Sequence, residues 1–448
     1  METLARQEDA PDDHHGPEAP FPTTGSQSPH STDDKVAASP ITVEAEEHSD
    51  SEGTKDSDVA SDAASVASCD SDYPALELNY DALKHIATFY LPGGHGRCVD
   101  VATLQEGTYY EIRALRFEDG WSCIGRFTRD KNESMSVAES DSATLKFIKQ
   151  HTTIPVPEVY FANYNPNHAV GAAFVLTERM PGKRLSDIWP GLISEHKLAA
   201  VLQIADVLAQ LARLHFRCIG SLREDGSVGP LQNLTIATKE PLRGPYDSFE
   251  EYMLGFLSED TGRPAVVMDV YSEIKEKLRT LPDEQLGSQV LKPPYRLIHG
   301  DLDLQNMLVA HDDPAKPPQL TGIIDWDNSF TGPAYYVFEY PIFIQDNEAE
   351  PDSYDENKML RKHFVKAIAN SFPAGSEARE EVWGCFRQKC FWLNAFRNIF
   401  TMHLWHPVEI EHAVVQRYLD RLKESAQPAY DGRLDYEPDS ELEQEADD

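Results

Sequence analysis

The most informative part of the sequence is the segment IHGDLDLQN at residues 298–306, followed by IIDWD at residues 323–327. Both are short apolar runs with polar residues at their ends, in a region that otherwise has the periodicity of helices. Asp301 and Asn306 stand on a loop between apolar strands, and Asp325 stands at the end of the next strand. These three side chains can therefore face one cavity.

A carboxylate, an amide and a second carboxylate in this order suit phosphoryl transfer. One carboxylate accepts the proton of the attacking hydroxyl, while the asparagine and the second carboxylate hold magnesium on the phosphates. The simpler interpretation is that His299 and Asp301 cap a turn and Asp325 closes a strand. Two motifs in this order and at this spacing favour the functional interpretation.

The flanking sequence predicts a mostly helical region from Pro181–Gly182 onward. Residues 195–216, for example, place apolar side chains at i, i+3, i+4 and i+7, as in a buried helix. The predicted helices cover residues 195–216, 247–258, 264–280, 354–371, 377–401 and 408–425.

The preceding part of the chain has the pattern of a small α+β lobe. Helices are predicted over residues 76–91 and 136–150, and strands over 109–117, 122–129, 154–164 and 172–180. The first two strands surround an Asp119–Gly120 turn and form a predicted hairpin.

The two ends of the chain differ from its middle in composition. The formal net charge is −36; residues 1–75 contain 18 acidic and three basic side chains, and residues 428–448 contain nine and one. Both segments have too little apolar area to offset chain entropy and are predicted to be disordered tails. Such an acidic chain is a poor candidate for nucleic-acid binding, which depends on Lys and Arg.

Cysteines and targeting signals indicate the compartment. The six cysteines show no paired or zinc-like spacing, so reduced thiols are expected. The acidic N-terminus has no apolar core, and no apolar run is long enough to span a bilayer. The expected location is the cytoplasm, without membrane binding, and the sequence does not distinguish it from the nucleus.

The motifs His-Gly-Asp-x-x-x-x-Asn and Ile-Asp-Trp resemble those of the aminoglycoside phosphotransferases and choline kinase-like enzymes, relatives of the protein kinases. The chain looks closest to fungal proteins with this domain, in which IGSL at 219–222 and TIPVP at 153–157 also recur. The resemblance runs from about residue 80 to 425. It implies a bilobal α+β kinase-like fold, with a β-rich lobe over about 76–178 and a larger, mainly helical lobe over about 183–427.

The resemblance also implies roles for residues of the large lobe. Asp301 would be the catalytic base, His299 would brace the loop beside it, and Asn306 and Asp325 would bind magnesium. Asp303 and Asp327 lie close to the implied metal, but such acids are more often solvated or outside direct coordination.

Residues of the small lobe would bind ATP. Arg126 stands where the family has a phosphate-binding lysine, a change that is not conservative. Its partner on the next helix would be Asp141, with Glu139 as the competing choice. A solvated Arg126 is the alternative.

The linker between the lobes would contact adenine through its backbone. Glu178, Arg179 and Met180 are candidates by position, and Met180 serves equally well as a core residue. The phosphate-covering loop has Gly107 alone, which disfavours a protein kinase.

Together these features predict ATP- and Mg²⁺-dependent phosphoryl transfer to a hydroxyl of a small molecule. A peptide acceptor is disfavoured because no long activation segment follows Asp325. A cationic or polyhydroxylated acceptor is favoured by Asp303, Asp327, Glu339 and the aromatic segment 385–405, although these acids could equally be solvated. The alternative function is a pseudokinase that binds nucleotide or acts as a scaffold, with protein partners on its acidic tails.

Overall fold

The computed structural model describes most of the chain from Ala75 to Asp420. The described residues are 75–106, 110–129, 135–232, 244–256, 269–270, 272–274, 276, 291–347, 350–387, 415–416 and 419–420. Outside this set lie the predicted tails up to Pro74 and from 428, Gly107, most of the predicted helices 264–280 and 408–425, and the aromatic residues of the segment 388–405.

The small lobe is built on a five-stranded antiparallel sheet in the order β1-β2-β3-β5-β4. Its strands are β1 (Cys98–Glu106), β2 (Tyr110–Phe117), β3 (Ser122–Thr128), β4 (Val159–Asn163) and β5 (Phe174–Glu178). The β2–β3 hairpin turns at the predicted Asp119–Gly120 position, where Gly120 has a φ of 87°. Strand β4 begins only after Pro155 and Pro157, since proline cannot donate to a strand ladder. Strand β1 was not predicted.

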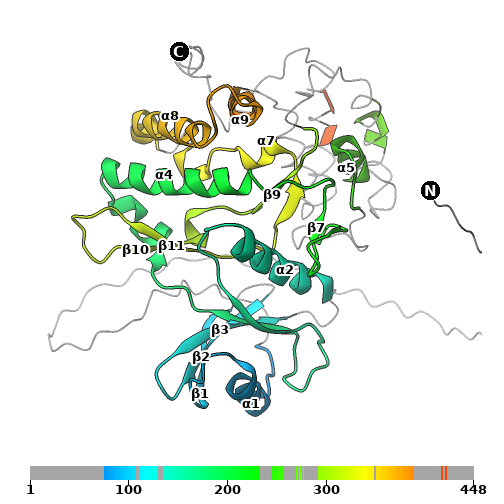
Figure 1. Cartoon of the computed structure of the whole chain (residues 1–448), viewed down its shortest axis with the longest axis vertical. Helices are drawn as coiled ribbons and strands as arrows, with labels where there is room; N and C mark the ends of the chain where they lie inside the picture. The colour runs from blue at the N-terminus through cyan, green and yellow to red at the C-terminus, as the bar shows by residue number, and fades with distance from the viewer. Residues whose placement is uncertain are drawn as a thin grey trace, which may run out of the picture. The chain divides into compact units, whose positions relative to one another are not determined.

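Helix α1 (Tyr80–Tyr90) covers one face of this sheet (Figure 1). The Asn79 side chain accepts a hydrogen bond from the Ala82 N–H and so caps the helix. Leu83 and Ile86 are buried with Leu115 and other sheet residues in one apolar cluster. The helix ends immediately before Pro92, as predicted.

Helix α2 (Met135–His151) follows the small-lobe strands in sequence but packs into the core of the large lobe. Its buried residues Ala143, Leu145 and Ile148 belong to the large-lobe apolar cluster. The Thr144 hydroxyl also accepts a hydrogen bond from Ser329 Oγ, at 3.3 Å. Figure 1 shows α2 between the small sheet and the large lobe. The helix therefore contributes to the large-lobe core while it also contacts strands β4 and β5 of the sheet.

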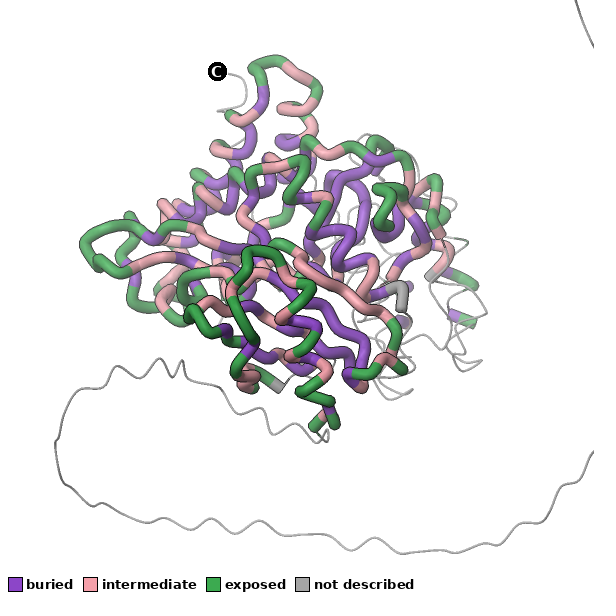
Figure 2. The backbone as a smooth tube through the Cα atoms, turned by 60° about the horizontal axis from the view of Figure 1, so that its bottom comes forward, coloured by how far each residue is buried: buried purple, intermediate pink, exposed green. Residues whose placement is uncertain are grey.

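The large lobe is mainly helical. Its principal described helices are α4 (Ser194–Leu211), α5 (Phe249–Phe256), α8 (Tyr354–Asn370) and α9 (Glu377–Arg387), with short helices α3 (Leu185–Ile188) and α7 (Ala334–Val337). Helices α4 and α8 lie side by side (Figure 1). Buried residues of these helices belong to one apolar cluster, and Figure 2 shows buried backbone in the interior of the molecule. The loop 311–317 is largely exposed. In the described part of the chain no helix is both long and apolar enough to cross a bilayer.

Short strands of the large lobe carry the predicted motifs. Strand β10 (Met307–Ala310) lies between β11 (Gln319–Ile323) and β6 (Lys183–Arg184) in a three-stranded sheet, and β9 (Arg296–Ile298) pairs with β12 (Phe330–Gly332). Strands β7 (Ser221–Leu222) and β8 (Val228–Gly229) form a small hairpin. The short 3₁₀ helices are η1 (Trp189–Gly191), η3 (Leu304–Asn306), η4 (Ile342–Ile344) and η5 (Pro351–Ser353).

The linker from β5 to β6 is held against the β10–β11 hairpin. The Thr321 hydroxyl donates a hydrogen bond to the Pro181 carbonyl, at 2.5 Å. Gly182 has a φ of 111°, and a Cβ there would lie 2.7 Å from the Val309 carbonyl oxygen. Glycine is required at this position because both its backbone conformation and the close approach exclude a side chain.

Replacing Ile148 with alanine tests whether α2 belongs to the large-lobe core. We expect the change to lower the free energy of unfolding by about 2–4 kcal/mol, because it leaves a cavity at a fully buried site. The matched control Ile342→Ala, at a residue 67% exposed, should cost less than about 0.5 kcal/mol. Urea unfolding followed by circular dichroism measures both, and equal costs would contradict the assignment.

Candidate active site

The loop that follows β9 is shaped by Gly300. Its φ is 85°, and a Cβ at this position would lie 2.4 Å from the carbonyl oxygen of Asn328. The loop therefore passes directly against the segment that follows Asp325. This contact brings the two predicted motifs together at the backbone level.

His299 links the same two segments through its ring. Its Nδ1 accepts a hydrogen bond from the Asp301 N–H at 3.3 Å, and its Nε2 donates to the Ile324 carbonyl at 3.1 Å. The ring also lies against Trp326, with a centroid separation of 4.3 Å. Burial lowers the pKa of His299 to about 4, so the imidazole is neutral near pH 7. These contacts connect the ring to both segments; the bracing role stays a prediction, as does the catalytic role predicted for Asp301.

Asp301 and Asn306 are joined by side-chain hydrogen bonds. The Asn306 Nδ2 donates to the Asp301 carbonyl at 2.9 Å and to its Oδ2 at 3.0 Å. Because Nδ2 faces Asp301, the Oδ1 of Asn306 points away from Asp301, and it can accept a hydrogen bond or bind a cation. Asn306 is buried, whereas Asp301 is partly exposed.

Asp325 reaches the site through strand pairing. Met307 pairs with Ile323, and the Ile324 N–H donates to the Asn306 carbonyl at 2.9 Å. These bonds place Asp325 next to the end of the Asn306 loop. Asp325 has a φ of 66°, the one positive value among the described non-glycine residues, and its side chain is 48% exposed. A left-handed aspartate costs conformational energy, and such strain is concentrated at functional sites.

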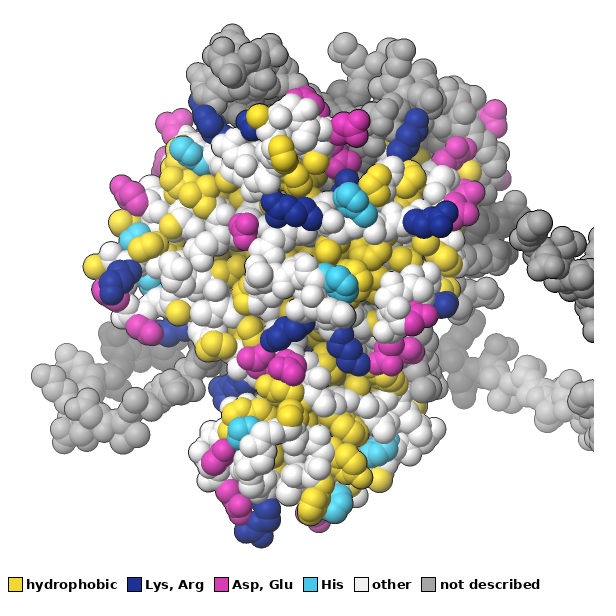
Figure 3. All heavy atoms as spheres, viewed as in Figure 1, with side chains coloured by type: hydrophobic (Ala, Val, Ile, Leu, Met, Phe, Trp, Pro, Cys, Tyr) yellow, Lys and Arg dark blue, Asp and Glu magenta, His cyan; other side chains and the backbone are white. Residues whose placement is uncertain are grey.

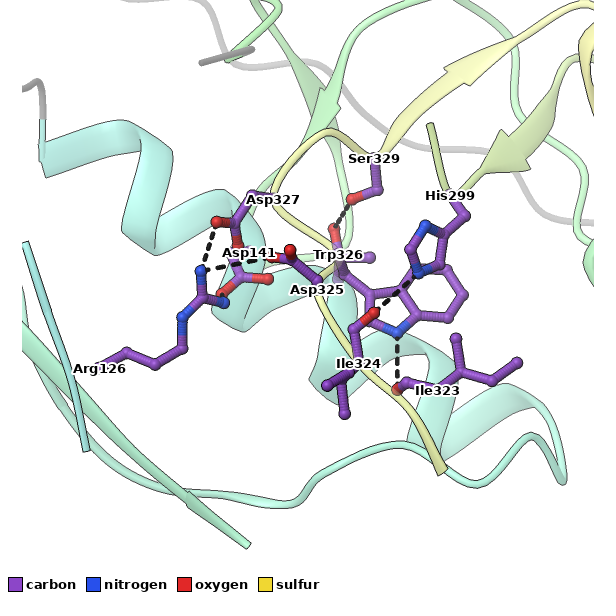
Figure 4. Close-up of polar contacts among 10 residues, drawn as sticks. Arg126, Asp141, His299, Ile323, Ile324, Asp325, Trp326, Asp327 and Ser329 are labelled. Atoms are coloured by element: carbon purple, nitrogen blue, oxygen red, sulfur yellow. Dashed lines mark hydrogen bonds and ion pairs between the residues drawn. The ribbon is translucent and has the colours of Figure 1, made fainter. Parts of the chain in front are cut away.

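Arg126 is surrounded by three carboxylates (Figure 4). Its Nη1 donates to Asp141 at 3.1 Å, its Nη2 donates to Asp327, and the Asp325 carboxylate lies 3.6 Å from Nη2. The guanidinium also stacks over the Tyr110 ring, 4.3 Å from its centroid. We call these four charged residues the Arg126 cluster. Of the two acids proposed from the sequence as its helix partner, Asp141 makes the contact.

The Arg126 cluster contains three acidic side chains and one basic side chain. Burial, followed by the charge of Asp327, raises the pKa of Asp141, and burial raises the pKa of Asp327 against the attraction of Arg126, so the two buried carboxyl groups take up a proton more readily than usual. One oxygen of each of these two buried acids, Oδ1, has no hydrogen-bond partner. Added positive charge would therefore be stabilised at this position.

The donor set fits magnesium that is shared with a phosphate ligand. Asn306 Oδ1 and the exposed Asp325 carboxylate are oxygen donors of the kind Mg²⁺ takes, usually with one or two carboxylates and substrate oxygens. Within the described part of the chain, no three His, Cys, Asp or Glu side chains form a complete metal site. A cation held here would thus depend on ligand oxygens as well as on the chain.

The linker candidates have different surroundings. The Glu178 carboxylate lies 3.3 Å from Lys149 Nζ and accepts a hydrogen bond from the Glu158 N–H, so it is directed toward α2 and β4. Met180 is half-buried beside Gly322 of β11, and Arg179 is exposed. Both roles considered for Met180, and backbone contact with adenine, stay predictions.

Two of the acids proposed to attract a cationic acceptor make the following contacts within the chain. Asp303 Oδ1 accepts a hydrogen bond from the Leu304 N–H and caps η3. Asp327, predicted to be solvated or outside direct coordination, is buried on Arg126. Glu339 is exposed. Sequence reasoning did not identify the Arg126–Asp327 contact, and the closeness of Asp327 to Asp325 was the one signal for it.

The fold and this loop define a bilobal α+β protein of the kinase-like class. Residues 114–336, which include Arg126, Asp141 and both motifs, match the model of the phosphotransferase enzyme family, APH. The region similar to this phosphotransferase family therefore contains both motifs and the Arg126–Asp141 pair.

Similar proteins occur in fungi. A subtelomeric hrmA-associated cluster protein of Aspergillus fumigatus is 25% identical over 393 residues, which cover 72% of this chain and 75% of that protein. The altered inheritance of mitochondria protein 9 of Yarrowia lipolytica is 22% identical over 300 residues, 54% and 51% of the two chains. The crystal structure of a putative aminoglycoside phosphotransferase from Ralstonia eutropha has a TM-score of 0.47 and 14% identity, covering 78% of this chain and all of that one.

Gly300→Ala tests the close contact between the two motif segments. We expect it to lower the free energy of unfolding by more than about 3 kcal/mol, because a left-handed conformation and a backbone clash combine. The matched control is Gly226→Ala, where φ is also positive at 77° but no atom lies within 4 Å of the added Cβ. It should cost about 1 kcal/mol. Chemical denaturation compares them, and equal losses would show that the contact is unimportant.

The pKa of His299 predicts a pH dependence of stability. Because the folded state holds this ring neutral down to about pH 4, the unfolded chain binds more protons between about pH 6.5 and pH 4. The free energy of unfolding should therefore decrease as the pH is lowered through that window. His299 should contribute about 2 kcal/mol of the loss between pH 7.5 and pH 5. His299→Gln should remove this contribution. Parallel unfolding free energies of the wild type and the variant across the window would contradict the prediction.

Proposed function

We propose that the protein transfers the γ-phosphoryl group of ATP, with Mg²⁺, to a hydroxyl group of a small molecule. The observation that carries the proposal is the joined arrangement of Asp301, Asn306 and Asp325 inside a phosphotransferase family domain. These are the groups that phosphoryl transfer requires, a base for the hydroxyl and oxygen donors for a metal.

Asp301 is the proposed catalytic base. Asn306 holds one of its carboxylate oxygens, and the backbone N–H of Asp301 is held by His299. A carboxylate fixed in this way accepts the proton of an acceptor hydroxyl without having to reorient. Positioning of this kind lowers the barrier because the reacting groups are already aligned.

Asn306 and Asp325 would hold the magnesium ion. When bound, this ion would neutralise charge on the phosphates. Hydrogen bonding of Asn306 Nδ2 to Asp301 orients the free Oδ1, and the pairing of β10 with β11 fixes the distance to Asp325. Arg126 would steady the phosphates from the small lobe. Its charge is shared with three acids, so we infer that it acts together with the metal.

A small-molecule acceptor is supported by the chain that follows Asp325. Apart from Asn328, residues 326–338 are buried and pass through β12 directly into α7. A peptide-binding activation segment needs an exposed stretch at this place.

Acidic and basic side chains are interspersed among the described residues on the face in Figure 3, without a continuous basic band.

Asp301→Asn should separate turnover from nucleotide binding. We expect turnover to fall at least about 100-fold, because the base is lost, while the affinity for Mg-ATP changes little. The control Asp312→Asn removes a charge from the exposed loop between β10 and β11 and should keep wild-type turnover. Steady-state ADP release and calorimetric titration with a non-hydrolysable ATP analogue measure the two properties. Full turnover by Asp301→Asn would refute the assignment.

A screen of acceptors, followed by ADP release, tests the substrate class. The panel should contain cationic amino-alcohols, aminoglycosides, sugars and a Ser/Thr peptide at equal concentration. Faster phosphorylation of the peptide than of every small hydroxyl compound would overturn the proposal. Nucleotide binding without ADP release on any acceptor would support the pseudokinase alternative.

A further inference from the structure

We propose that Asp327 makes nucleotide binding depend on a divalent cation, by holding Arg126 and keeping the phosphate site negative until a cation enters. Asp327 is thus a positioning residue that determines which form of the nucleotide binds. The inference rests on the nucleotide- and metal-binding part of the proposed function and does not depend on which acceptor is used.

The first support is the geometry of Asp327. It lies in the large lobe, is buried, and contacts Nη2 of Arg126 in strand β3 of the small lobe. Asp141 contacts the other terminal nitrogen, Nη1, of the same guanidinium. Both terminal nitrogens of Arg126 are therefore engaged by carboxylates before any phosphate arrives.

The second support is the balance of charge. One guanidinium faces Asp141, Asp325 and Asp327, so the acids outnumber it even when one of the two buried carboxyl groups is protonated. In a partly desolvated site, each additional carboxylate repels a polyphosphate strongly. A nucleotide without its cation would approach a site whose positive group is already outnumbered.

The third support is that the surroundings of Asp327 are rigid. Trp326 is fully buried and its indole N–H donates to the Ile323 carbonyl, while the Ser329 N–H donates to the Trp326 carbonyl. The opposite wall of the cluster is α2, which is packed into the large-lobe core. The acids therefore stay close to Arg126, and a cation that enters with the nucleotide would add positive charge to this fixed group.

The test compares nucleotide affinity with and without metal. The probe is a non-hydrolysable ATP analogue, titrated by calorimetry into the full chain in Mg²⁺ or in EDTA. For the wild type we expect EDTA to weaken binding by on the order of 100-fold; for Asp327→Asn this ratio should shrink by about tenfold, because one negative charge is removed. Asp327→Glu keeps the charge and should keep the wild-type ratio.

The matched control is Asp346→Asn. Asp346 forms a similarly buried pair with Arg361, which stands on helix α8 of the large lobe. Each terminal nitrogen of Arg361 lies 2.9 Å from one carboxylate oxygen of Asp346. It tests the general loss of an Arg–Asp pair and should leave the ratio unchanged. If Asp327→Asn does not fold, Asp327→Ser removes the same charge with a smaller side chain and takes its place.

The outcomes separate this inference from the proposed function. An unchanged ratio in Asp327→Asn or Asp327→Ser, even with weaker binding overall, would overturn the inference and leave Asp327 a structural partner. A reduced ratio, together with no phosphoryl transfer to any acceptor, would support the inference and refute the proposed catalysis. If the wild type binds nucleotide in neither buffer, both are refuted.

Discussion

The attraction between the Arg126 guanidinium and the carboxylates around it is the interaction on which the arrangement of the site depends. Asp141 comes from α2, and Asp325 and Asp327 come from the segment after β11. A buried arginine would be costly without such partners, and buried acids would be equally costly without the arginine. The small-lobe sheet and the large-lobe loop therefore stabilise each other's charged side chains.

The packing of α2 explains why this cluster has a defined geometry. Because Ile148 and its neighbours lie in the large-lobe core, the position of Asp141 is set largely by packing in that lobe, whereas Arg126 stands on strand β3 of the sheet. The two acids that contact the terminal nitrogens thus belong to one packed body. Any rotation of the small sheet about the linker would change the position of Arg126 relative to both at once.

Much of the fold and part of the site could be predicted from the sequence. The helical periodicity of 136–150 and the turn at Gly120 are local signals, and both elements form where predicted. Strand β1 was missed because Val99 is half exposed and polar residues interrupt its apolar pattern. The Arg126–Asp327 contact joins residues 201 positions apart, so no local pattern could reveal it.

The chemistry of arginine gives a reason for the departure from the family's usual lysine. Arginine presents terminal nitrogens on two sides of a planar group, whereas an ammonium is a compact point charge. Arg126 uses this shape to contact Asp141 and Asp327 together. Aspartate is one methylene shorter than the glutamate usual on the helix, and the longer arginine still closes the pair at 3.1 Å. The two changes compensate in length and conserve charge. The acid added to the pair is Asp327 on the second terminal nitrogen, and a site with this additional acid favours ligands that bring positive charge with them.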